Sequence, residues 1–226
     1  MNLFKKKIEF PQFIANLIKF QFDLVDRNFE KWVVMDDEFK VLTSEDKKKL
    51  HQITDYLILA DIHFGCLIHL SNKISRKISD DGVGYYFGYV ISSTYVEFLY
   101  NYRKMDIKDA QAKGKKFTEF WDFFAKHSEK AKKMTEEYKK SGGHPIEIKD
   151  DGDRAKADLC SAFGEYYSIK IGNGATEPNG IDGRNYAAFK FAMAMTKADL
   201  VGYWLKEYKV EFDSGVISNL FNERLK

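Results

Sequence analysis

The sequence predicts an all-α protein, a helical bundle of six or seven helices with two largely buried central helices. Apolar residues recur at spacings of three and four over several long stretches, as on one face of a helix. The chain of 226 residues holds 3 Pro, which fits long uninterrupted helices because proline breaks them. No pair of segments shows the alternation of two neighbouring strands. Helices packed on helices are therefore expected.

The first two helices are predicted at about 11–33 and 44–74. Pro11 stands in the first turn of the first helix, where proline is tolerated. Thr43 or Ser44 can cap the second helix. Its middle, 56–70, is apolar nearly all round, which is typical of a helix buried on most sides.

The third and fourth helices are predicted at about 83–102 and 107–138. Asp80, Asp81 and Gly82 are expected to form a turn and cap before the third helix, which is apolar on most faces. The fourth helix is amphipathic, with lysines covering the faces that its apolar stripe leaves. That stripe consists of Phe117, Phe120, Trp121, Phe124, Ala131, Met134 and Tyr138.

The remaining helices are predicted from about 150 to 171, from 184 to 208, and in a short segment after Ser214. The segment 172–183 is rich in glycine and reads as a connecting loop. A chain of this length fits one domain, so 1–226 is predicted to be a single helical domain. The Gly-Gly-His-Pro stretch makes 141–150 the candidate subdomain boundary.

Composition predicts a folded protein with a bulky core. Hydrophobic residues make up 44% of the chain, and its rings come from 19 Phe, 13 Tyr and 3 Trp. The formal net charge of +2 disfavours nucleic acid or an anionic membrane as partner. Residues 103–140 are the exception, with 12 Lys or Arg against 7 Asp or Glu.

Two cysteines, Cys66 and Cys160, lie far apart in apolar helical segments, which indicates buried thiols in a reducing compartment. The start of the chain has no clean apolar run of signal-peptide type, and no stretch of 18 or more apolar residues predicts a membrane span. We therefore expect a cytoplasmic protein without a membrane span.

Four ionisable residues lie in helices that look too apolar to carry them, and these are the candidate metal ligands: Asp61, His63, Glu97 and Glu165. Burying a lone carboxylate is costly, so such groups are paired, hydrogen-bonded, protonated or metal-bound. Glu165 shares a helix face with Ser161 and Asp158. Asp61 and His63 are about 200° apart around their helix, too far to share one metal easily. Buried polar networks are the alternative interpretation, and the sequence identifies no cofactor.

Three functions are compatible with this sequence. The first is a non-enzymatic protein that binds a protein partner or forms a homo-oligomer, since no catalytic motif is present and apolar residues are in surplus. The second is a helical-bundle enzyme or ligand binder, metal-dependent or not, that uses Glu97, Glu165 and either Asp61 or His63. The third is nucleic-acid binding through 103–140, which would show steep salt dependence.

Overall fold

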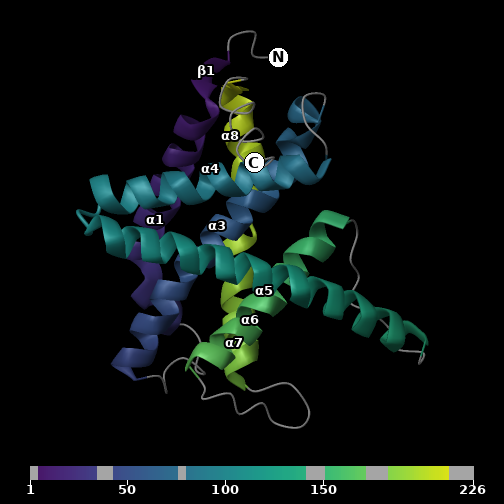
Figure 1. Ribbon diagram of the computed structural model, residues 1–226. Helices are drawn as coiled ribbons and strands as arrows, with labels where there is room; N and C mark the ends of the chain where they lie inside the picture. The colour runs from purple at the N-terminus through teal and green to yellow at the C-terminus, as the bar shows by residue number, and fades with distance from the viewer. Residues whose placement is uncertain (1–4, 35–42, 76–79, 141–150, 172–182, 214–226) are drawn as a thin grey trace. The chain divides into compact units, whose positions relative to one another are not determined.

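A computed structural model describes residues 5–34, 43–75, 80–140, 151–171 and 183–213 of the chain (Figure 1). Helices dominate it and the central ones are buried, so the predicted all-α bundle is confirmed. In addition to the helices, the structure contains a short two-stranded sheet. The helices are α1 (Phe10–Val34), α3 (Ser44–Ile74), α4 (Asp80–Asn101), α5 (Ile107–Lys140), α6 (Asp151–Ile171), α7 (Gly183–Thr196) and α8 (Leu200–Glu207), and the strands are β1 (Lys6–Glu9) and β2 (Tyr208–Glu211).

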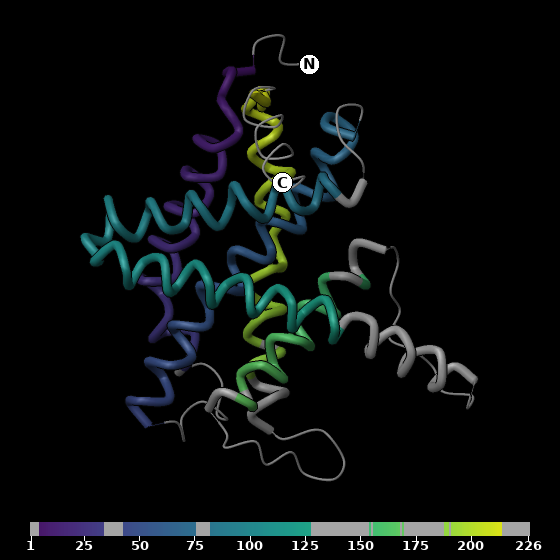
Figure 2. The backbone as a smooth tube through the Cα atoms, in the orientation of Figure 1, coloured from purple at the N-terminus to yellow at the C-terminus, as the bar shows by residue number. Residues whose placement is uncertain are grey.

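The chain folds as two compact units, and both are discontinuous in sequence. Unit 1 comprises Met1–Phe22, Ile62–Lys115 and Asp199–Lys226, and unit 2 comprises Asp23–Asp61 and Lys116–Ala198. Helices α1, α3 and α5 each contribute residues to both units. Figure 2 traces the path of the backbone through them. The single domain stays a prediction, and its candidate boundary at 141–150 lies outside the described residues.

Helix α3 begins with a reciprocal capping arrangement. The Thr43 hydroxyl accepts a hydrogen bond from the Asp46 backbone N–H at 3.1 Å, while the Thr43 backbone N–H donates to the Asp46 carboxylate at 3.3 Å. Two backbone donors that a free helix end would leave unpaired are thereby satisfied. The predicted cap is therefore Thr43.

The middle of α3 is buried on most sides, as its composition predicts. Leu57, Ile58, Leu59, Ala60 and Ile62 are each at most 2% exposed. Among the described helices, α3 is the one long and apolar enough to cross a membrane, with 72% of its apolar window buried in the structure. A core helix meets the same criterion, so the absence of a membrane span stays a prediction.

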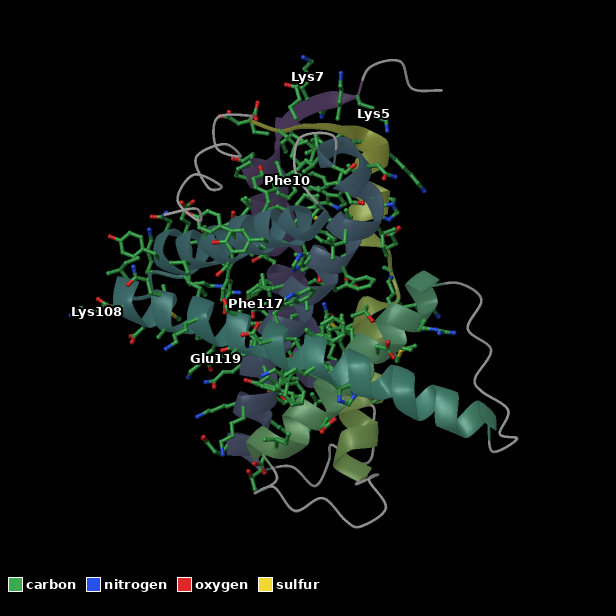
Figure 3. All side chains as sticks on the ribbon, turned by 45° about the vertical axis from the view of Figure 1, so that its right-hand side comes forward. Lys5, Lys7, Phe10, Lys108, Phe117 and Glu119 are labelled. Carbon is green, nitrogen blue, oxygen red and sulfur yellow. The ribbon has the colours of Figure 1, made fainter. Side chains whose placement is uncertain are left out.

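Aromatic rings form the core of unit 1. Phe10 is fully buried against Tyr86, Phe87 and Phe212, with ring centroids 5.6, 5.2 and 5.1 Å away. These rings come from the start of α1, from α4 and from the residue that follows β2, so they join three distant parts of the sequence. Figure 3 shows Phe10 beneath the strand β1, which carries Lys7.

The core of unit 2 is also aromatic. Phe120 on α5 stacks with Tyr56 of α3 and meets the Tyr166 ring of α6 edge-on, at centroid distances of 6.2 and 5.0 Å. Phe163 of α6 stacks with Phe191 of α7 at 6.4 Å. The buried α5 residues Phe117, Phe120 and Phe124 belong to the predicted stripe, and exposed Glu119 lies off it (Figure 3).

The strands β1 and β2 pair in parallel, with Ile8 opposite Val210. An ion pair of 2.8 Å joins the Lys7 ammonium to the Glu211 carboxylate, and Val210 is buried beneath the ladder. Each strand has four residues, too few for alternation to identify it from the sequence. Because the pairing is parallel, the end of α8 lies beside the start of β1, and the start of α1 lies beside the end of β2.

Two predicted helix boundaries were wrong. The helix expected at 184–208 is two helices, because residues 197–199 interrupt it. The Lys156 ammonium donates to the Thr196 carbonyl, which ends α7, and the Asp199 carboxylate accepts from the Gly202 N–H, which begins α8. Helix α4 begins at Asp80, where a turn was expected. The helix predicted after Ser214 and the loop at 172–182 lie outside the described residues.

Gly65 lets α8 approach α3 closely within unit 1. A Cβ atom at Gly65 would lie 2.6 Å from Val201 Cγ2 and 2.8 Å from Val201 Cβ. Valine is stiff about χ1 and Val201 is buried, so it has little room to move. We expect Gly65→Ala to reduce the free energy of unfolding by about 1–3 kcal/mol through overpacking, although alanine favours helix.

Urea unfolding of a double-mutant cycle with Val201→Ala measures this contact. The loss from Gly65→Ala is expected to shrink when Val201 is already alanine. Gly84→Ala is the control, because a Cβ there meets nothing within 4 Å and should stabilise α4 slightly. Additive effects of Gly65→Ala and Val201→Ala would contradict the clash.

Candidate functional site

The four residues predicted as metal ligands have different environments. Asp61 and His63 are buried on α3, at 7% and 2% exposure, whereas Glu97 on α4 is exposed and Glu165 on α6 is partly exposed. Asp61 and Glu165 belong to unit 2, and His63 and Glu97 belong to unit 1. Among the described residues, no group of three or more His, Cys, Asp or Glu side chains could hold a metal ion. The metal site stays a prediction from sequence.

His63 packs against Gly84 and Gly88 of α4. Its Nε2–H donates to the Gly84 carbonyl at 3.0 Å, and its Cε1 would lie 3.3 Å from a Cβ at Gly88. Because a carbonyl only accepts, Nε2 carries the proton. Burial lowers the pKa of His63 to about 4, against the opposing effect of the Gly84 hydrogen bond. The imidazole is therefore neutral at pH 7.

Both cysteines are free and buried, as predicted. Burial raises the pKa of Cys160 to about 11, and Asp61 adds to the shift while the Thr196 hydroxyl, 3.4 Å from Sγ, opposes it. Burial also raises the pKa of Cys66. Both thiols are protonated at pH 7, so neither is a ready nucleophile.

Glu165 lies in a cluster with His127 and Ser161 within unit 2. His127 projects from α5, and its Nδ1 contacts the Glu165 carboxylate. The Nε2 of the same ring lies 3.1 Å from Ser161 Oγ. Ser161 and Glu165 are four residues apart on α6 and so share one face. Because the carboxylate only accepts, the His127 proton sits on Nδ1, and Nε2 accepts from the Ser161 O–H.

Two further histidines pair with carboxylates. In unit 1, His69 Nε2 of α3 lies 2.7 Å from Asp199 Oδ2, at the cap of α8. In unit 2, His51 Nε2 lies 3.3 Å from Asp26 Oδ1. These pairs tie helices together. The Ser161–His127–Glu165 cluster differs because its imidazole has a hydroxyl on the second ring nitrogen.

Sequence reasoning placed Ser161 and Glu165 on one helix face but missed His127. The spacing of four residues between Ser161 and Glu165 can be recognised in the sequence, whereas His127 lies 34 residues before Ser161 on another helix. A basic amphipathic helix with a histidine near its aromatic stripe was the only local signal. The pairing of α5 with α6 is tertiary, and no pattern within either helix specifies it.

Exposed tyrosines lie along α4 in unit 1. Tyr85, Tyr89 and Tyr100 are 44, 46 and 49% exposed. At 3.6 residues per turn, the three side chains fall within about 60° of one another around the helix. Between them along the same face, Val96 Cγ2 and Ser92 Oγ would lie 2.7 and 3.5 Å from a Cβ at Gly114 of α5. Helix α5 therefore crosses this side of α4 between Tyr89 and Tyr100, and the tyrosine face is defined as Tyr85 and Tyr89, which lie together on one side of the crossing.

Comparison with known proteins gave no matching family model, curated protein or solved structure.

Proposed function

We propose that the protein acts by binding another protein chain through the exposed aromatic surface of unit 1. The described residues include ten large hydrophobic side chains that are exposed, and eight of them belong to unit 1. The eight are Phe20, Ile68, Tyr85, Tyr89, Tyr100, Tyr102, Ile107 and Tyr203. Single exposed apolar residues are ordinary, so the concentration in one unit is what supports the proposal.

The tyrosine face is the observation that carries the proposal. Tyrosine is enriched in protein interfaces, because its ring offers a large contact area at a small entropy cost and its hydroxyl tolerates water. Tyr85 and Tyr89 stand on a helix held by close packing against α5, so little ordering entropy would oppose binding. At the end of the helix, the Lys19 ammonium lies 4.6 Å from the Tyr102 ring centroid.

A second copy of the chain is the first partner to test, because closed homodimers are the commonest soluble oligomers. Sedimentation equilibrium of the purified protein is expected to show a mass that rises with concentration. The double variant Tyr85→Ser/Tyr89→Ser is expected to weaken association about 100-fold, since each interface tyrosine contributes more than about 1 kcal/mol.

Ile169→Ser is the matched control. Ile169 is 45% exposed, like the two tyrosines, but it belongs to unit 2, so its replacement should leave association unchanged. Equal weakening by both variants would show that general surface apolarity drives association. A monomer at every soluble concentration would eliminate self-association.

We also propose a cytoplasmic location. Two free, buried thiols support it, because disulfides form readily in oxidising compartments.

A further inference from the structure

We propose that Ser161 is a nucleophile activated by His127 and oriented through Glu165, and that it reacts with carboxylic esters of apolar acyl or aryl character. This inference concerns unit 2 and is independent of binding through the tyrosine face. It rests on the order of atoms in the Ser161–His127–Glu165 cluster: hydroxyl, Nε2, Nδ1, carboxylate. The same order defines hydrolytic triads on unrelated folds, which are recognised by geometry and role.

The three side chains have the exposure that such a role requires. Ser161 is exposed, so a substrate carbonyl can approach its Oγ. The side chain of His127 is 11% exposed and that of Glu165 is 31% exposed, which keeps the base mostly shielded from water. The distance of 3.1 Å between Oγ and Nε2 lies within reach for direct proton transfer.

Aromatic rings beside the cluster indicate the substrate class. The Phe123 ring stacks with the His127 imidazole at a centroid distance of 6.1 Å and an interplanar angle of 18°. Tyr166 meets Phe123 edge-on at 5.4 Å. These rings hold the imidazole in its plane and place an apolar surface next to it. An apolar acyl or aryl group fits that surface better than a charged one.

The reaction balances without any cofactor. Ser161 Oγ bonds to the acyl carbon while its proton passes to His127 Nε2, and the carboxylate of Glu165 stabilises the resulting imidazolium. The ester C–O bond then breaks, and the proton leaves with the alcohol. Water, deprotonated by the same Nε2, releases the carboxylic acid and restores Ser161.

The position of Ser161 in the middle of α6 limits the rate. In a strand-to-helix turn, the backbone N–H of the residue after the nucleophile stabilises the oxyanion. Here that residue is Ala162, and its N–H belongs to the helical hydrogen bonds of α6, so it cannot do so. One missing oxyanion donor lowers kcat roughly 100- to 1,000-fold. Covalent labelling is therefore a sharper readout than turnover.

The test is labelling of the full chain with an alkyl fluorophosphonate, followed by peptide mass spectrometry. Ser161 Oγ bonds to phosphorus, fluoride leaves and the proton passes to His127. Label is expected on Ser161 and absent from Ser161→Ala. Ser44→Ala is the matched control, because Ser44 is also an exposed serine of unit 2 and its loss should change nothing. No label on Ser161 in folded protein would overturn the proposal.

His127→Gln separates activation from simple exposure. Glutamine keeps a polar side chain of similar reach but is not basic, so the labelling rate is expected to fall roughly 100-fold. Glu165→Gln tests orientation, with nitrogen NMR of the imidazole as a readout that does not depend on labelling. The wild type should show the proton on Nδ1, and the variant should lose that preference. Equal labelling rates in His127→Gln and wild type, with circular dichroism unchanged, would refute activation by His127.

Discussion

Replacing Phe10 with alanine is expected to lower the free energy of unfolding by about 3–5 kcal/mol, which is typical of a fully buried phenylalanine. The ring contacts Tyr86, Phe87 and Phe212, so its loss leaves a cavity bordered by three other rings. Those rings come from segments far apart in sequence and cannot all close the gap. A loss of this size is a large fraction of the stability of an ordinary domain.

Urea unfolding followed by circular dichroism measures this loss. Phe20→Ala is the matched control on the same helix, since Phe20 is 42% exposed while Phe10 is 0% exposed. The control is expected to lose less, because its ring is only partly removed from water and its described ring contact is with Trp204. Equal losses would mean that Phe10 is not the anchor of the unit 1 core.

Acid is expected to destabilise the protein through His63 by up to about 3 kcal/mol. The folded-state pKa is about 4, below the value of 6.5 for an unperturbed histidine. The unfolded state therefore binds the proton first, and stability that is complete above pH 6.5 is lost as the pH falls towards 4. The size follows from 1.36 kcal/mol for each unit of pKa difference.

The measurement is the free energy of unfolding at pH 7, 6, 5 and 4.5 in wild type and His63→Gln. A glutamine amide can still donate to the Gly84 carbonyl but does not titrate. Carboxylates contribute to both proteins alike, so the difference between the two curves isolates His63. Parallel curves over this range would contradict a depressed pKa for His63.

Local signals in the sequence predicted most of the helices. The cap at Thr43 and the apolar middle of α3 need no information from the rest of the chain. The stripe on α5 likewise placed Phe117, Phe120 and Phe124 in the core. A long stretch in which apolar residues recur with the period of a helix is compatible with few other structures.

Features that depend on distant partners could not be predicted. The break between α7 and α8 contains no glycine or proline, and it depends on Lys156 reaching the Thr196 carbonyl from another helix. The strands need each other, and Ile8 and Val210 are about 200 residues apart. Whether the four candidate metal ligands share one site could not be predicted for the same reason, because spacing within a helix does not say which helices face each other.

The parallel pairing of β1 with β2 constrains how the protein folds during its synthesis on the ribosome. A chain emerging from its N-terminus presents β1 first and β2 only about 200 residues later, which takes roughly 10–40 s at ordinary rates of synthesis. Until then Phe10 lacks the Phe212 ring, and an apolar segment stays open to other nascent chains. Unit 2, whose residues all precede Asp199, can mature earlier. Chaperones that act during translation should therefore bind mainly to the first helix.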